Sequence, residues 1–84
     1  MPRAAYATVK KERGIIILET PFNAEFVMDL KEESKSRSWN GEFWTVDIAE
    51  KNLVVNLIKT YYWNIPAYLI EGAVTTNIHT GEVC

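Results

Sequence analysis

The sequence predicts an α+β fold, a small single domain in which a mixed or antiparallel sheet packs on two helices. Three observations predict this class. Residues 15–18 form a short apolar run of strand length, the pair Asn40-Gly41 is typical of a tight hairpin turn, and two segments carry apolar residues at helical spacing. The expected order is strand, helix, hairpin, helix and one or two late strands.

One core is the most that this chain can support. Its 84 residues are 48% hydrophobic, and a chain of this length buries only about 60 to 65% of its unfolded surface. We therefore expect residues 14–84 to form a single α/β domain. Residues 1–13 end in a charge cluster, which predicts a polar N-terminal arm or an edge strand.

The first strand and the first helix are predicted on either side of Pro21. The apolar run 15–18 is typical of a strand that is covered on both faces. Asn23 is placed to cap the helix, and Glu25 suits its first turn. The apolar residues at helical spacing are Phe22, Phe26, Val27 and Leu30.

A hairpin is predicted around Asn40-Gly41, because a type I′ turn needs positive φ at both central residues and this pair tolerates it best. In a two-residue loop, Trp39 faces Glu42 across the strands. Alternation along each strand then places four side chains on one face: Arg37, Trp39, Trp44 and Val46.

The second helix is predicted to begin after Asp47, because Glu50 three residues later completes an arrangement akin to a capping box. Its apolar stripe consists of Leu53, Val54, Leu57, Ile58 and Tyr61. Pro66 ends the helix, and the apolar run 68–70 predicts a late strand, with a looser alternating stretch after Gly72.

Composition narrows the functional classes. A net charge of −2 does not provide the basic field that steers proteins to nucleic acid, although a local patch can act alone. The one cysteine, Cys84, excludes an internal disulfide and suits a reducing compartment. The sequence also lacks an apolar run approaching the roughly 18 residues of a membrane span, and a signal-peptide pattern. We expect a cytoplasmic protein.

The sequence offers no convincing catalytic set. His79 is the one histidine and falls in a Thr-rich tail, so neither a Cys-His pair nor a Ser-His-acid triad can be assembled. Phosphate-binding glycine loops are absent, and the neighbours Glu32 and Glu33 are typical of a solvated helix face. We expect a non-enzymatic protein without a cofactor or a bound metal.

Recognition of another macromolecule is the remaining class of function, and the first candidate surface is the hairpin. Trp39 and Trp44 could stack on bases, but two tryptophans that face a helix pair are more often part of the core. Both interpretations hold if Trp44 is buried and Trp39 lies at the rim. The candidate nucleic-acid-binding residues are Lys31, Lys35, Arg37 and Trp39, with Lys59 as a further phosphate contact.

The second candidate surface is the run Tyr61, Tyr62 and Trp63 at the end of the second helix. Three consecutive aromatic residues cannot all face one core, so at least one should be exposed. These residues could bind a protein partner, or they could form a lid over the sheet.

The order of these motifs resembles the HARP-type (HepA-related) module, which precedes the motor of annealing helicases. In such modules an aromatic residue and Asn open the first helix, Lys ends it, and a basic residue plus Trp starts a hairpin that ends in W-x-V. The matching positions are Phe22, Asn23, Leu30, Lys31, Arg37, Trp39, Trp44 and Val46. The pattern, over residues 15–62, is also similar to small open reading frames of bacteriophages. The resemblance implies binding to branched or single-stranded DNA.

Two functions of different classes are therefore predicted. The first is a non-enzymatic accessory domain that binds single-stranded or branched DNA. The alternative is a protein-interaction module, for example a phage-encoded inhibitor of a host enzyme or defence complex, because Glu32, Glu33 and Glu42 would weaken phosphate binding. A homo-oligomer that pairs through an edge strand is compatible with either function.

Overall fold

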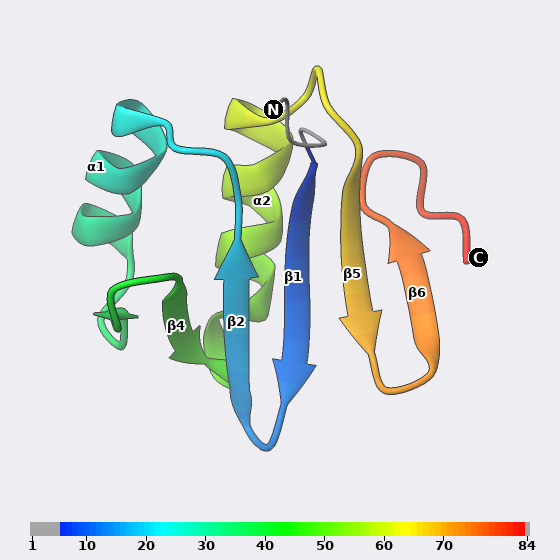
Figure 1. Cartoon of the computed structure of the whole chain (residues 1–84), viewed down its shortest axis with the longest axis horizontal. Coiled ribbons are helices and arrows are strands. Elements are labelled where there is room, and N and C mark those ends of the chain that lie inside the picture. The colour runs from blue at the N-terminus through cyan, green and yellow to red at the C-terminus, as the bar shows by residue number, and fades with distance from the viewer. Residues whose placement is uncertain (1–5, 84) are drawn as a thin grey trace.

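A six-stranded mixed sheet with two α-helices on one face makes up residues 6–83, the part of the chain that this computed structural model describes (Figure 1). Residues 1–5 of the predicted arm and Cys84 lie outside this part. The elements are β1 (Ala7–Glu12), β2 (Ile15–Glu19), α1 (Ala24–Glu33), β3 (Ser38–Trp39), β4 (Trp44–Asp47), the 3₁₀-helix η1 (Ile48–Glu50), α2 (Lys51–Tyr61), β5 (Ala67–Glu71) and β6 (Val74–Asn77). The predicted α+β class is confirmed.

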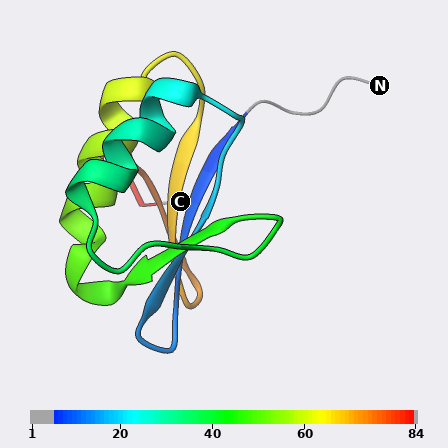
Figure 2. The same ribbon diagram turned by 90° about the vertical axis from the view of Figure 1, so that its left-hand side faces the viewer.

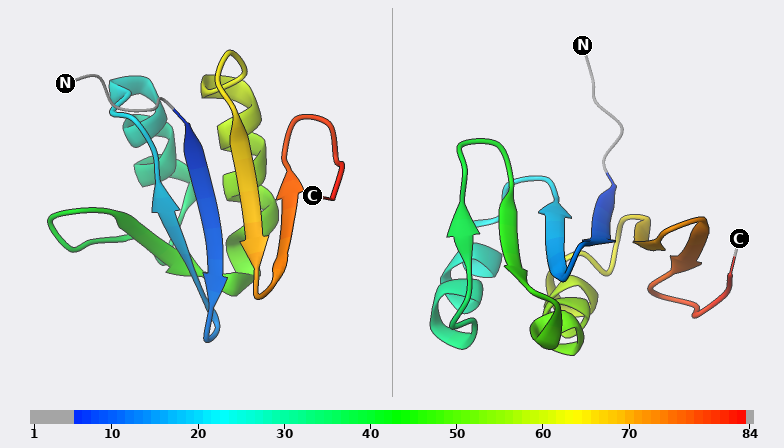
Figure 3. Two further views of the ribbon diagram at one scale, coloured as in Figure 1. Left: turned by 45° about the vertical axis from the view of Figure 1, so that its right-hand side comes forward. Right: turned by 90° about the horizontal axis from the view of Figure 1, so that it is seen from below.

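The strands lie in the order β3-β4-β2-β1-β5-β6. The sheet is mixed because β1 and β5 run parallel, whereas the other neighbouring strands are antiparallel. Both helices lie side by side on the same face, and no described helix covers the other face (Figure 2). The loop of the β3–β4 hairpin rises on that uncovered side, away from the helices (Figure 3).

The core lies between the helices and the sheet face beneath them. Its buried residues come from both helices, from the four strands β1, β2, β4 and β5, and from the segments directly after α2 and β6: Ala7, Val9, Ile16, Leu18, Phe26, Leu30, Val46, Val54, Leu57, Ile58, Tyr62, Ala67 and Ile78. Because one sheet face supplies the strand residues of this set, they alternate with partly or fully exposed residues along each strand.

β1 is an interior strand, so the prediction of an arm or an edge strand is wrong for this segment. Ala7 and Val9 are fully buried and point toward the helices. The charge cluster of residues 10–13 falls in the second half of β1 and in the turn that follows it. That turn is Arg13-Gly14, with φ of 50° and 82°, the two positive values that a type I′ turn requires.

β2 is covered on one face only, contrary to the prediction for residues 15–18. Ile16 and Leu18 are buried beneath the helices, whereas Ile15 is 41% exposed and Ile17 is partly exposed. The strand is half-covered although its run is uniformly apolar, because both helices pack on the same face of the sheet.

The hairpin has a four-residue connection in place of the predicted two-residue turn. Trp39 pairs with Trp44, which shifts the register by two residues from the prediction. The amide oxygen of Asn40 accepts hydrogen bonds from the backbone nitrogens of Glu42 and Phe43, both at 2.9 Å. Asn40 therefore does not adopt the positive φ of a type I′ turn. A shift of two keeps every side chain on its predicted face.

Both helices begin close to their predicted positions. The side chain of Asn23 accepts a hydrogen bond from the backbone nitrogen of Phe26 at 3.0 Å, as a cap does. Asp47 caps η1 through the nitrogen of Ala49 at 2.8 Å, and α2 follows. The prediction that Glu50 completes a capping box is wrong, because its carboxylate binds Ser34 and Lys35 and makes no bond to Asp47.

The tail forms the two late strands β5 and β6, in agreement with the predicted one or two. The imidazole Nε2 of His79 lies 3.0 Å from the carbonyl oxygen of Tyr62 and 2.9 Å from that of Ile65. His79 therefore ties the tail to the loop between α2 and β5. Neither α1 nor α2, nor any other described helix, has the length and apolar character to cross a membrane.

Candidate functional site

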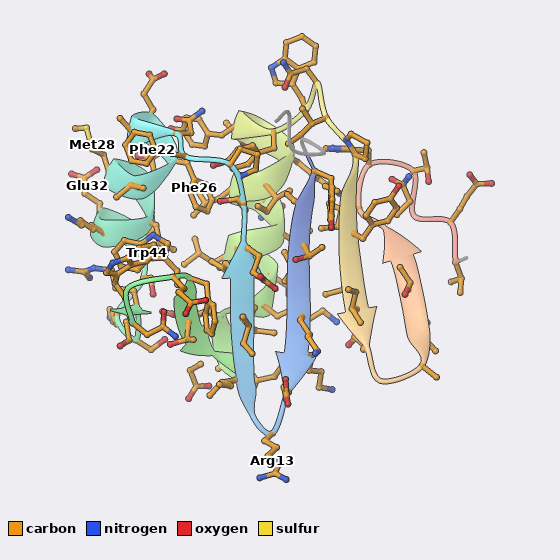
Figure 4. All side chains as sticks on the ribbon, viewed as in Figure 1. Arg13, Phe22, Phe26, Met28, Glu32 and Trp44 are labelled. Atoms are coloured by element: carbon orange, nitrogen blue, oxygen red, sulfur yellow. The ribbon has the colours of Figure 1, made fainter. Side chains whose placement is uncertain are left out.

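An aromatic groove lies between α1 and the β3–β4 hairpin. Its volume is about 390 Å³, and its lining consists of Phe22, Val27, Lys31, Trp39 and Trp44. Figure 4 shows Trp44 beside α1, with Met28 and Glu32 on the side of the helix away from the sheet. We refer to these five lining residues as the aromatic groove.

The two tryptophans meet because they are directly opposite each other on antiparallel strands. Their ring centroids are 5.2 Å apart and their planes are inclined by 48°. Trp44 is partly buried and packs against the core, whereas Trp39 is 53% exposed. One tryptophan thus supports the other, which presents an aromatic surface to solvent.

α1 supplies the opposite wall. Val27 and Lys31 are one helical turn apart, next to the buried pair Phe26 and Leu30, so they lie at the margin of the core-facing stripe. Phe22 precedes the cap residue and is 86% exposed. Phe22 and Val27 occupy the N′ and N4 positions of a hydrophobic staple, a local signal that could have placed them together from the sequence.

Three of the four candidate nucleic-acid-binding residues are basic. Lys31 lines the groove, and Lys35 and Arg37 lie in the segment that joins Lys31 to the other groove wall at Trp39. All three are exposed, and within residues 6–83 none of them forms an ion pair. Lys59, by contrast, lies on α2 and does not line the groove.

The segment that carries Lys35 and Arg37 is held in place by Glu50. The Glu50 carboxylate accepts hydrogen bonds from the hydroxyls of Ser34, at 2.6 Å, and Ser36, and from the backbone nitrogen of Lys35 at 2.9 Å. These bonds, of which that from Ser34 has the largest effect, lower the pKa of Glu50 to about 2. Arg37 adds a bond from Nη1 to the carbonyl oxygen of Ser34 at 2.9 Å.

The second aromatic cluster is mostly engaged inside the protein. Tyr62 is 4% exposed and packs edge-on against Phe26, with ring centroids 5.2 Å apart. Its hydroxyl contacts Thr20 and Pro21, and burial raises its pKa. Tyr62 is therefore buried in this structure, and its predicted role in binding a partner stays a prediction.

Tyr61 and Trp63 differ in their surroundings. The hydroxyl of Tyr61 donates a hydrogen bond to the carboxylate of Asp29, which raises the pKa of Tyr61 to about 12. Trp63 is 72% exposed, so it is the member of the cluster that a partner can reach. At least one exposed aromatic residue was expected in this run, and that expectation is confirmed.

A second, wider hollow lies on the uncovered face of the sheet. Its volume is about 1050 Å³, and it is lined by Tyr6, Thr8, Lys10, Glu19, Thr20, Pro21, Phe22, Glu42, Ile70 and Gly72. Within residues 6–83, no group of three His, Cys, Asp or Glu side chains is placed to hold a metal ion. The aromatic groove brings together two of the candidate recognition residues, Lys31 and Trp39, whereas none of the candidates lines the hollow.

No protein-family model, curated protein or solved structure matches this chain. The resemblance to the HARP-type module, and the DNA-binding role that it implies, stay predictions.

Proposed function

We propose that this protein is a non-enzymatic domain that binds single-stranded or branched DNA through the aromatic groove. The observation that carries this proposal is the position of Lys31 in the same groove as the exposed ring of Trp39. An aromatic surface and a cation in one groove suit a nucleotide, because its base stacks and its phosphate is anionic.

The groove favours unpaired bases. Its aromatic rings lie between a helix and a hairpin, and a base inside a duplex presents only its edge to such a surface. An unpaired base can turn its face to Trp39, and one such stacking contact is worth about 1 to 3 kcal/mol. Single strands and the unpaired parts of branched DNA therefore suit the groove better than continuous duplex.

The electrostatic contribution to DNA binding comes from local charges. The net charge of the chain is −2, so long-range steering toward DNA is weak. Lys31, Lys35 and Arg37 supply three phosphate contacts at most. For a single strand, three contacts correspond to a slope of about −2 in a plot of log affinity against log salt.

Fluorescence anisotropy with a labelled single-stranded oligonucleotide tests the proposal. At about 50 mM salt we expect micromolar binding that weakens with salt, and about a tenfold loss for Trp39→Ala. Lys31→Ala should weaken binding to all sequences alike. The matched controls Trp63→Ala and Lys59→Ala remove an exposed aromatic ring and an exposed charge outside the groove and should bind like the wild type. Failure of the wild-type protein to bind would refute the proposal.

Recognition of a protein is the alternative, and the exposure of Trp63 supports it. Exposed tryptophans often contribute strongly to protein interfaces. In a pull-down from cell lysate, this alternative predicts a stoichiometric partner that Trp63→Ala loses and Trp39→Ala retains.

A further inference from the structure

The aromatic groove and the hollow on the uncovered sheet face meet at Phe22. Phe22 lines both of them and is 86% exposed, so it projects between the two surfaces. A strand of DNA held in the groove would reach Phe22 at one end of its path. What lies beyond Phe22 therefore decides how much of the strand this protein can hold.

The two surfaces carry opposite charge. Lys31 lines the groove, and Lys35 and Arg37 follow it along the chain toward Trp39. The hollow is lined instead by two carboxylates, Glu19 and Glu42, and by one ammonium group.

That ammonium group belongs to Lys10, which also lies beside a further carboxylate in an exposed ion pair. Its Nζ lies 3.7 Å from the carboxylate of Glu12 on the same strand. Glu42 lies in the hairpin loop, which stands on the uncovered side of the sheet (Figure 3). A phosphate that entered the hollow would meet more carboxylates than ammonium groups, and salt at 0.1 M screens this repulsion only partly within the screening length of about 10 Å.

We propose that Glu19 and Glu42 form an acidic boundary that limits the site to a short single-stranded segment of roughly four nucleotides, the low end of the site sizes of OB folds. This inference rests on the proposed function of the groove. The segment runs from Phe22 along Lys31, Lys35 and Arg37 toward the hairpin, and it is kept off the uncovered sheet face. The ligand class is then a short gap, a tail or a strand end, and not a long strand that wraps around the protein.

Length-dependent binding tests the boundary. Labelled oligothymidylates of about 4, 8 and 16 nucleotides are titrated with the protein. Each affinity is divided by the number of registers, that is, the number of positions along the oligonucleotide at which a site of about four nucleotides can bind. We expect per-register affinities that agree within about twofold, and a salt slope of about −2 at every length.

The double variant Glu19→Gln/Glu42→Gln removes the boundary with little change in side-chain volume. We expect its per-register affinity for the longest oligonucleotide to rise about threefold or more, with the shortest unchanged. Glu82→Gln, which removes an exposed carboxylate in the tail, is the matched control and should leave the length dependence as in the wild type.

Two results overturn the boundary while leaving the proposed function intact. One is a wild-type affinity that keeps rising with length after the correction for registers. The other is a double variant that binds every length like the wild type. Lack of binding at every length would instead overturn the proposed function, and the boundary with it.

Discussion

The carboxylate of Glu50 accepts a hydrogen bond from the hydroxyl of Ser34 at 2.6 Å, which joins the start of α2 to the end of α1. Ser34 is 2% exposed and is the one buried polar residue of the described chain. The same carboxylate binds the next two residues, so a single side chain fixes the segment between the helix and the hairpin.

Glu50 makes the stability of the protein depend on pH. Its pKa is lowered to about 2 in the folded state, below the value of about 4.3 expected in the unfolded chain. Its contribution is therefore complete above the unfolded pKa and is lost as the pH falls toward the folded pKa. After allowance for solvent screening, this contribution is roughly 1 to 2 kcal/mol.

Urea unfolding at about pH 6 and about pH 2.5 measures this effect. We expect the wild-type protein to lose more unfolding free energy between the two pH values than Glu50→Gln does. Glu33→Gln, an exposed substitution at the end of α1, should behave like the wild type. Equal losses in the wild type and Glu50→Gln would show that ionisation of Glu50 contributes nothing to the pH dependence of stability.

Asp29 should control the ionisation of Tyr61. The hydrogen bond between them raises the pKa of Tyr61 to about 12, because loss of the tyrosine proton breaks the bond and places two negative charges together. In an alkaline titration of tyrosinate absorbance, Asp29→Asn should lower this pKa toward the ordinary value of about 10. Subtraction of the Tyr61→Phe titration isolates the signal, and an unchanged pKa in Asp29→Asn would contradict this account.

Phe22 and Phe26 should differ strongly in their effect on stability, although the sequence gives both as apolar residues at helical spacing. Phe26 is 1% exposed, so Phe26→Ala should cost about 3 to 5 kcal/mol through lost burial and the cavity that it leaves. Phe22 is 86% exposed, and Phe22→Ala should change stability by about 0.5 kcal/mol or less. Similar losses in chemical denaturation would place Phe22 in the core.

A substitution in the turn between β1 and β2 should increase the stability of the protein. Arg13 has φ of 50°, which is unfavourable for a long side chain and well tolerated by asparagine. Arg13→Asn should raise the unfolding free energy by about 0.5 kcal/mol, whereas Gly14→Ala should lower it by about 1 kcal/mol. Thermal denaturation of the two variants should shift in opposite directions, and shifts of the same sign would contradict the turn geometry.

The signals that could be predicted from the sequence are local. Asn23 caps α1 as expected, because a cap is bonded to the backbone three residues away. The stripe of α2 is buried at Val54, Leu57 and Ile58, because helical periodicity relates neighbouring turns. Lys31 and Trp39 were selected for their chemistry, but Phe22 and Val27 were not recognised as the other walls of the same groove.

The structural features that the sequence did not predict depend on contacts between distant segments, or on local hydrogen bonds that compete with the predicted turn. β1 lies in the sheet interior because β2 and β5 pair with its two edges. Of these, β5 begins more than fifty residues later in the sequence. Asn40 bonds the backbone of its own loop and so overrides the turn that the pair with Gly41 favours. Tyr62 is buried because Phe26, from the other helix, packs against it.

By itself, the sequence determined the class of this protein, the positions of its two helices and the aromatic and basic residues available for recognition. Tertiary structure alone decided that both helices cover one face of the sheet, that Glu50 anchors the segment with Lys35 and Arg37, and that Phe22 divides a basic groove from an acidic hollow. The physical reason is the range of the interactions. Capping and periodicity act within a few residues, whereas strand order, burial and the charge of a surface depend on segments that meet only when the chain folds.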